Sequence, residues 1–387
     1  MRRGIVAAVR AGASRRAVAR ERRVSLATVQ LWLERAGDAR LDRVDWSDRP
    51  SRPHRTTRTE RGLEERVLTL RRELREESPL GEYGAAAIRR ELLARPDPAT
   101  TVPSLRTIGR ILERRGALDA RRRTRRPPPP AGWYLPDLRS GRAELDSLDI
   151  IEGLRLKGGL DVDVLTVVSL HGGLPGAWPD AGVGAGTVLA ALGEHWGAVG
   201  LPAYAQFDND ARFTGGHNHP DTIGRVIRFC LALSVVPVFV PPRETGFQAA
   251  VEALNGRWQQ KVWARRGFSG SLVDLQTRSA AYIGAYRRRA ASRIESAPPR
   301  ASMPPLIELD GPLSGHLVFL RRTSETGNVT ILNRVHHIDR HWPHRLVRAD
   351  LDIDARRLEV FALRRREPDD QPLLAQLDYE PPERWFR

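Results

Sequence analysis

The spacing of apolar positions divides the chain into a helical first third and a remainder of short strands and helices. Within residues 1–46, apolar side chains recur three and four positions apart, as they do on one face of a helix. Ser14 and Ser25 each precede such a segment and stand where helix N-caps are expected. A helix, a short turn and a second capped helix are typical of a helix-turn-helix module, which we predict for residues 1–46.

A similar arrangement is expected over residues 47–118, after a polar joint that contains prolines. Its first helix should carry one apolar face, formed by Leu63, Val67, Leu70 and Leu74. Ser104 is placed to cap the last helix, which we expect to begin at residue 105. The spacing predicts a second helix-turn-helix module, although its middle connection is longer than usual.

Residues 119–140 contain a run of arginines followed by four prolines. Such a composition is typical of a solvated and semi-rigid linker. In a chain that binds DNA, the same arginines could follow phosphates across a groove. We therefore expect 119–140 to be an Arg/Pro-rich linker, with DNA contact as a second role.

Residues 141–295 have the alternation of β-branched runs and helical segments that is typical of an α/β domain. The expected strands are 148–151, 162–170, 175–178, 203–207 and 235–240. The expected helices are 187–200, 222–233, 246–264 and 271–293. This alternation predicts one α/β domain between the helical modules and the C-terminal part of the chain.

Short alternating strands at regular spacing follow a proline-rich segment near residue 300. They predict a small β-barrel over 310–366. The last residues, 367–387, are polar and acidic, and we expect a flexible tail there. The fold class is thus multidomain: an all-α N-terminal part, a central α/β core and a C-terminal β-barrel.

The charge of the chain favours a polyanionic partner. The 387 residues carry a formal net charge of +16, and the pI is about 11.1. Only Lys157 and Lys261 are lysines, so the basic charge is almost entirely arginine, whose planar guanidinium matches phosphate geometry. An arginine-rich genome would raise the arginine count in the same way, so genome composition is a second explanation for the high arginine content.

Composition also excludes several classes of protein. A single cysteine, Cys230, excludes a disulfide framework and a cysteine-rich zinc site, and it fits a reducing compartment. We see no signal peptide, no membrane span and no Walker loop that would indicate an ATP-driven step. We therefore expect a cytoplasmic, nucleoid-associated protein.

Three acidic residues lie in three settings that suit metal-dependent chemistry. Asp149 is in an apolar strand, Asp208 ends another strand, and Glu252 lies in a helix. A carboxylate beside a buried strand is costly unless a cation balances its charge. Two divalent cations held by such a set can catalyse phosphoryl transfer. Any one of these acids alone would be read as a solvated strand end or helix face.

The sequence around these acids resembles a known superfamily. FDNDARF (207–213) is similar to the motif at the second catalytic Asp of transposases and integrases of the retroviral-integrase type. Gly246 followed by VEALN (251–255) resembles the segment around their catalytic Glu, and LDSLDII (145–151) resembles the first Asp. The chain is thereby identified as resembling a DDE transposase of the insertion-sequence type, and the resemblance implies a ribonuclease-H-like integrase catalytic core.

The resemblance also implies roles for individual residues. Asp149, Asp208 and Glu252 would bind two Mg²⁺ ions, or Mn²⁺, and act as the catalytic set. Asn209 would brace the loop that carries Asp208. The residues expected to contact DNA lie in the helical modules, the linker and the Glu252 helix: Arg15, Arg16, Ser25, Thr28, Gln30, Arg106, Arg110, Arg121, Arg122, Arg123, Asn255, Arg257 and Lys261.

Some positions depart from the superfamily pattern. Asp210 stands where glycine is usual, and SLHGG (169–173) replaces the usual end of the second strand. Asp146 competes with Asp149 as the first ligand, but an odd separation in a strand places the two on opposite faces. We prefer Asp149 because it lies in the more apolar half; Asp161 and Asp163 are weaker alternatives.

These observations predict a transposase that binds element ends and catalyses Mg²⁺-dependent strand cleavage and strand transfer. Its partners would be double-stranded DNA, as terminal inverted repeats and as target, and further copies of the chain in a homo-multimer. Two alternatives remain open. One is a catalytically inactive remnant that acts as a DNA-binding regulator, and the other is a nuclease of the same fold.

Overall fold

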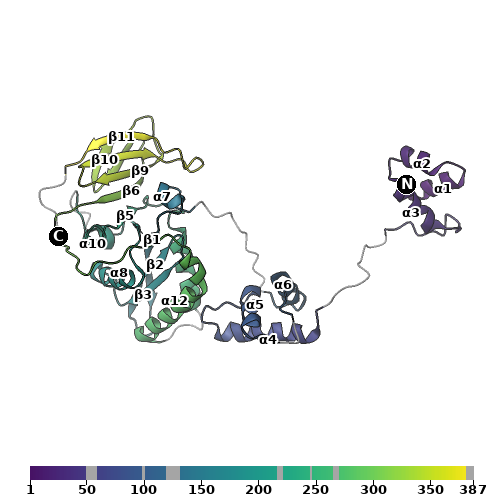
Figure 1. The fold of residues 1–387 in the computed structure, drawn as a ribbon, viewed down its shortest axis with the longest axis horizontal. Helices are drawn as coiled ribbons and strands as arrows, with labels where there is room; N and C mark the ends of the chain where they lie inside the picture. The colour runs from purple at the N-terminus through teal and green to yellow at the C-terminus, as the bar shows by residue number, and fades with distance from the viewer. Residues whose placement is uncertain are drawn as a thin grey trace. The chain divides into compact units, whose positions relative to one another are not determined.

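The computed structural model describes residues 1–48, 59–97, 101–118, 131–215, 221–244, 246–264 and 270–380. The chain divides into two compact units, Met1–Leu63 and Glu64–Arg387. Figure 1 shows the helices and strands of both units along the chain. None of the helices among these described residues is long and apolar enough to cross a membrane.

The first unit is built from three short helices, α1 (Arg2–Arg10), α2 (Arg15–Glu21) and α3 (Leu26–Ala36). Both expected caps are present: the hydroxyl oxygens of Ser14 and Ser25 accept hydrogen bonds from the backbone N–H of Ala17 (3.2 Å) and Thr28 (3.1 Å). Each helix contributes buried residues to the small core, among them Ile5, Val18 and Val29. The two short turns and their caps therefore hold α2 and α3 in a tight pair.

The second helical group comprises α4 (Arg61–Glu77), α5 (Ala85–Ala94) and α6 (Leu105–Arg114), and Ser104 caps α6. Val67 and Leu70 of α4 are buried against residues of α5 and α6, among them Ile88 and Ile108. The apolar face of α4 is thus used inside this group.

The rest of the second unit is organised around one nine-stranded sheet with the order β11-β10-β9-β6-β5-β4-β1-β2-β3. The strands are β1 (Leu145–Arg155), β2 (Asp161–Ser169), β3 (Pro175–Asp180), β4 (Tyr204–Phe207), β5 (Val236–Phe239), β6 (His316–Arg322), β9 (Leu346–Asp352), β10 (Arg357–Ala362) and β11 (Leu373–Asp378). A separate two-stranded sheet pairs β7 (Asn328–Ile331) with β8 (Arg334–His337).

Helices cover both faces of the β1–β5 part of the sheet (Figure 1). On one face, α8 (Ala185–Val199) and α10 (Arg225–Ala232) pack into a large apolar cluster with buried residues of β1, β2, β4 and β5. On the other face lie α11 (Ala249–Trp258), its π-helical extension η1 (Gln259–Trp263) and α12 (Leu272–Glu295). A short helix, α9 (Ala211–Thr214), follows β4.

Strand direction makes this a mixed sheet. β1, β2 and β3 are antiparallel neighbours, whereas β4 and β5 run parallel to β1. The central part of the chain is therefore a mixed α/β structure with a large sheet, compatible with the ribonuclease-H-like integrase core expected from the sequence.

The C-terminal strands do not form the separate small barrel that we expected over 310–366. β6 pairs parallel with β5, placing Phe319 opposite Phe239, and β9, β10 and β11 extend the same sheet beyond it. An alternating pattern shows that a segment is a strand but not which neighbour it will pair with. Here the free edge of β5 receives β6, which satisfies backbone groups that would otherwise be unpaired.

Two further boundaries differ from expectation. Residues 373–378 form β11 instead of a flexible tail, and Tyr379 is buried with its hydroxyl donating to Asp221 at 2.8 Å. Trp133 and Tyr134, expected in the linker, are buried beside α7 (Pro136–Arg139). Polar composition misleads at the tail because an edge strand is held mainly by its backbone. The positions 119–130 and 381–387 lie outside the described residues.

Candidate active site

Two parallel strands bring the first two candidate acids to the same level of the sheet. β1 and β4 are in register with Ser147 opposite Gln206. Asp149 and Asp208 each follow two residues later, so both stand where the carboxyl end of β4 meets β1. Two-residue steps return to the same face of a strand, and the two carboxylates are thus brought together on one face.

Helix α11 supplies the third acid. It packs on β1 and β2 through Val251, Leu254 and Trp258, all fully buried. The side-chain amide of Gln248, at its N-cap, donates to the carbonyl of Leu148 at 2.9 Å and anchors the start of the helix on β1. Glu252 lies on the exposed side of the first turn.

The pKa of Asp149 is affected by the other two acids. Burial, together with repulsion from Asp208 and Glu252, raises the pKa of Asp149 to about 6, against opposing hydrogen bonds from Ile150 and Asn255. The Asn255 side-chain amide donates to Asp149 Oδ2 at 2.7 Å, and its oxygen accepts from Thr166 at 2.7 Å. Asn255, expected to contact DNA phosphate, is thus already engaged in orienting Asp149.

Asp208 lies in a loop held at several points. Burial, and repulsion from Asp210, raise the pKa of the Asp208 carboxyl. The Asn209 amide donates to the Val240 carbonyl at 2.8 Å, and its oxygen accepts from Arg321 at 2.8 Å. Asn209 therefore ties the loop to the end of β5 and to β6, which is the geometry that a bracing role requires.

Arg212 is a neighbour of this site that the sequence did not reveal. Its guanidinium pairs with Asp210 (2.7 Å), Glu152 (2.6 Å) and Asp163 (3.7 Å). Asp210, which replaces the usual glycine, also caps α9 by accepting from the Arg212 backbone N–H at 2.8 Å. The extra negative charge of Asp210 is thus balanced locally. In the sequence, the only indication of this pair was that Arg212 follows Asp210 by two positions in DNDARF.

Asp146 occupies a different environment from Asp149. It is fully buried on the α8 side of the sheet, where Trp196 Nε1 donates to Oδ2 at 2.9 Å and Arg300 forms an ion pair with both oxygens. Burial raises the pKa of Asp146 to about 6, in opposition to the nearby Arg300 charge. Asp146 is consequently a structural partner of Arg300 and is not available as the first ligand.

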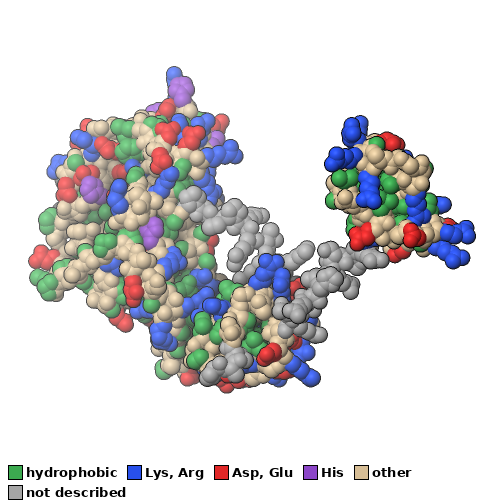
Figure 2. All heavy atoms as spheres, turned by 45° about the vertical axis from the view of Figure 1, so that its right-hand side comes forward, with side chains coloured by type: hydrophobic (Ala, Val, Ile, Leu, Met, Phe, Trp, Pro, Cys, Tyr) green, Lys and Arg blue, Asp and Glu red, His purple; other side chains and the backbone are tan. Residues whose placement is uncertain are grey.

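The remaining candidate DNA contacts fall into four groups. Arg15, Arg16, Gln30, Arg106 and Arg110 are exposed on the helical modules, and Figure 2 shows basic side chains spread over the surface of the Met1–Leu63 unit. Ser25 and Thr28 bond to each other as part of the α3 cap.

The other contacts are engaged or outside the described residues. Arg257 stacks over the Tyr286 ring at 5.2 Å, and Lys261 donates to the Gly81 carbonyl at 3.2 Å. Both cations are thus held by neighbours in the second unit. Arg121, Arg122 and Arg123 lie outside the described part of the chain.

The chemistry of the three acids fits a hard divalent cation, because carboxylate oxygens are the ligands that Mg²⁺ and Mn²⁺ prefer. The raised pKa values of Asp149 and Asp208 also favour a cation site, since a bound cation would offset the cost of burying these carboxylates and the repulsion from their acidic neighbours. As placed, however, no group of three or more His, Cys, Asp or Glu side chains among the described residues could hold a metal.

Comparison with known proteins gives weak likenesses. No protein-family model and no curated protein matches this chain. The catalytic core domain of BIV integrase is similar at 14% identity with a TM-score of 0.29, over 38% of this chain and 84% of that one. The simian T-cell lymphotropic virus intasome, solved in complex with a PP2A regulatory subunit, is similar at 13% identity with a TM-score of 0.33, over 70% and 88%. Likeness at this level assigns neither a family nor an activity to this chain.

The raised pKa of Asp149 leads to a prediction about pH. Because Asp149 must be deprotonated to bind a cation, Mg²⁺ affinity should rise about fivefold from pH 5 to 6 and level off above pH 7. Without metal, the free energy of unfolding depends on pH in the opposite direction. The stabilising contribution of Asp149 is fully present below pH 4 and is lost as pH rises through about 6. Calorimetric titration with Mg²⁺ would measure this, and Asp149→Asn should have a weaker pH dependence, with the part that comes from the raised pKa of Asp208 remaining. An affinity that is flat from pH 5 to 7 would contradict it.

Proposed function

We propose that this protein is a DNA transposase that cleaves DNA strands at element ends and joins them to target DNA in a Mg²⁺-dependent reaction. The observation that carries the proposal is the register of β1 and β4, which places Asp149 beside Asp208 at the carboxyl end of β4. Glu252 on α11 lies near enough for its charge to raise the pKa of Asp149. Three carboxylates from two strands and a helix form a patch of negative charge that a polyanionic substrate could approach only with cations present.

The proposed reaction assigns a role to each of these side chains. Asp149, Asp208 and Glu252 would hold two divalent cations, which supply activation of the attacking oxygen and stabilisation of the leaving oxygen. Asn255 orients Asp149 through its amide, and Asn209 fixes the Asp208 loop. Protein side chains in such a site mainly position groups and neutralise charge.

The residues proposed to bind DNA are mostly on the helical modules. Exposed arginines on α2 and α6 would contact phosphates, and the N-terminal halves of α3 and α6 would enter the major groove. Because one set of acids cannot act on two element ends at once, the active species would be a homo-multimer that forms on DNA. The net charge of +16 opposes association of free chains until DNA neutralises it.

The experiment that tests the function is a cleavage and joining assay on a labelled duplex that carries the inverted repeats flanking the gene. Mg²⁺-dependent cleavage followed by joined products supports a transposase. Cleavage without joining indicates the nuclease alternative, and binding without cleavage indicates the inactive regulator. The engaged state of Asp149, with Asn255 on one oxygen and the Ile150 N–H on the other, is what keeps the inactive alternative open.

Asn255 provides a prediction that is specific to this arrangement. Replacing Asn255 by Ala removes the donor to Asp149 Oδ2 and frees that carboxylate to rotate. Loss of such an outer partner typically lowers metal affinity or activity about 10–100-fold, and we expect a similar fall in the cleavage rate. Single-turnover kinetics would measure it. Asn255→Asp, which cannot donate to Asp149, should not restore the rate, and full activity in either variant would contradict this role.

DNA binding by the full chain should depend steeply on salt. If Arg15, Arg16, Arg106 and Arg110 each contact one phosphate, changing all four to Gln should reduce the slope of log affinity against log salt by about 3 to 4. Fluorescence anisotropy on duplex DNA between low and moderate salt would give both slopes. Circular dichroism would verify that the exposed substitutions leave the helices intact. An unchanged slope would show that these arginines do not face DNA.

A further inference from the structure

A bulge in β1 lies next to the candidate active site. The register of β1 with β2 shifts between Ile151 and Leu154, so Glu152 and Gly153 lie opposite a single residue of β2, Asp163. Gly153 has a positive φ of 74°, a backbone conformation that glycine adopts without strain. Bulges are common beside active sites, where they turn a side chain in a new direction. Here the bulge brings two acids of neighbouring strands, Glu152 and Asp163, within reach of one cation.

That cation is Arg212, which belongs to the segment that follows Asp208. Its guanidinium makes a two-point contact with Asp210: Nε donates to Oδ1 at 2.8 Å and Nη2 donates to Oδ2 at 2.7 Å. Nη2 also donates to Glu152 Oε1 at 2.6 Å, and Nη1 lies 3.7 Å from Asp163 Oδ2. Arg212 therefore connects the loop after β4 to both β1 and β2.

These contacts suit a structural connection better than a substrate contact. Each nitrogen of the Arg212 guanidinium has a carboxylate partner, so this side chain is not free to bind a phosphate. A single pair with Glu152, whose side chain is 62% exposed, would contribute little. The two-point contact with Asp210 fixes the plane of the guanidinium, however, and the three acids form a network. Without Arg212, the like charges of Glu152 and Asp163 would repel each other across the two strands.

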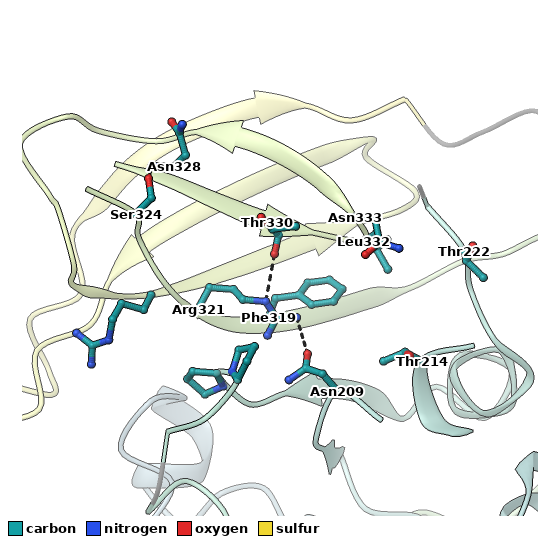
Figure 3. Close-up of a pocket in the computed structure, with 13 residues that line it drawn as sticks. Asn209, Thr214, Thr222, Phe319, Arg321, Ser324, Asn328, Thr330, Leu332 and Asn333 are labelled. Atoms are coloured by element: carbon teal, nitrogen blue, oxygen red, sulfur yellow. Dashed lines mark hydrogen bonds between the residues drawn. The ribbon is translucent and has the colours of Figure 1, made fainter. Parts of the chain in front are cut away.

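The connection reaches Asp208 through the backbone. The N–H of Asp210 donates to Asp208 Oδ1 at 3.0 Å, while the carboxylate of Asp210 accepts from Arg212. Asn209 is held separately by Arg321 of β6, as the dashed line in Figure 3 shows. Because β6 and β1 lie on opposite sides of β4 in the sheet, the contact with Arg321 does not fix the loop relative to β1. The contacts of Arg212 supply that second restraint.

We propose that Arg212 is a positioning residue, which sets the separation between the Asp208 loop and the strand that carries Asp149. In this role Arg212 touches neither a cation nor a substrate and acts through Asp210 on Asp208. The effect on catalysis rests on the proposed function, whereas the restraint on the loop does not. A displacement of about 1 Å at a catalytic group can lower a rate by on the order of 100-fold.

The first test measures the loop of the full chain in EDTA and without DNA. Hydrogen exchange of a peptide covering 207–214, followed by mass spectrometry, reports how often this loop opens. Arg212→Gln should speed exchange in that peptide about 10-fold, because hydrogen bonds between charged groups are lost. Arg212→Lys should give an intermediate rate, since an ammonium keeps the charge but not the planar fork.

A double variant separates geometry from charge. Arg212→Gln leaves the site with one more negative charge, whereas Arg212→Gln combined with Glu152→Gln has the net charge of the unchanged protein. The connection is absent in both, so the double variant should still exchange about fivefold faster than the unchanged protein. Glu152→Gln alone, at an exposed position, should also speed exchange, and it tests the connection if Arg212→Gln fails to fold.

The matched control is Arg155→Gln, an equal loss of charge at an exposed arginine of β1. Arg155 pairs with Asp161 at 3.3 Å, beyond the bulge. Its replacement should leave exchange of the 207–214 peptide unchanged. Unaltered exchange in the folded Arg212→Gln variant, or full recovery in the double variant, would overturn the positioning role.

The second test is single-turnover cleavage of a labelled terminal-repeat duplex at saturating protein. Arg212→Gln should lower the rate about 10–100-fold, with the affinity for duplex DNA unchanged by anisotropy. An affinity that falls as much as the rate would indicate a phosphate contact and would contradict a positioning role. If the unchanged protein does not cleave DNA, the proposed function fails, while the exchange experiment still decides whether Arg212 holds the loop.

Discussion

Replacing Asp208 by Asn is expected to lower the rate of DNA strand cleavage by on the order of 10³-fold or more while leaving duplex binding unchanged. The change keeps the shape of the side chain and removes the charge that would hold a cation. Glu252→Gln should have the same effect, because Glu252 belongs to the same set of acids. Cleavage of a labelled terminal-repeat duplex and anisotropy on the same DNA would give the two measurements.

The matched control for this experiment is Asp161→Asn. Asp161 is an exposed acid at the start of β2 that pairs with Arg155 at 3.3 Å, and it was a weaker candidate for the first ligand. Its replacement should leave cleavage within about twofold of the unchanged protein, since exposed ion pairs of this kind contribute little. Retained cleavage in Asp208→Asn or Glu252→Gln would remove those residues from the mechanism.

The second large effect is expected from the buried ion pair on the opposite face of the sheet. Arg300→Met should lower the free energy of unfolding by about 3–5 kcal/mol at pH 7.5, because it leaves the fully buried Asp146 carboxylate without its cation. Urea unfolding of the full chain would measure the loss. Combining Arg300→Met with Asp146→Asn should recover much of it, since the Asn oxygen can still accept from Trp196.

The pH dependence of this loss follows from the raised pKa of Asp146. The folded value of about 6 lies above the ordinary value of 3.8, so the folded state holds more protons between these pH values. The stabilising contribution of Asp146 to the free energy of unfolding is therefore fully present below pH 4 and is lost as pH rises through 6. Without Arg300 the carboxylate costs more still, so the deficit of Arg300→Met should shrink at pH 5 and grow toward pH 8. A deficit that is equal at both pH values would contradict this account.

The local structure of the chain could largely be predicted from short-range patterns. Ser14, Ser25 and Ser104 cap the helices where they were expected to, because a cap depends only on neighbouring backbone groups. The strands around Asp149 and Asp208 were found for a similar reason, since a short run of apolar residues is itself a local pattern. The opposite faces of Asp146 and Asp149 also followed from the two-residue repeat of a strand.

Long-range pairing could not be predicted in the same way. The C-terminal strands were recognised as strands, but only the tertiary structure shows that β6 adds to β5 and continues the central sheet. The sequence likewise proposed Asn255 and Lys261 for DNA contact, whereas in the fold Asn255 bonds to Asp149 and Lys261 to Gly81. Such partners lie far apart along the chain and come together only when the elements pack.

The sequence by itself thus determined the order of helices and strands, the charge of the chain and the three acids that we propose as catalytic. Only the tertiary structure decided which charges meet: Arg212 with Asp210, Arg300 with Asp146, and Arg321 with no acid at all among the described residues. The physical reason is the range of each effect. Helix and strand patterns depend on residues a few positions apart, whereas the balance of buried charge depends on every segment that folds around it.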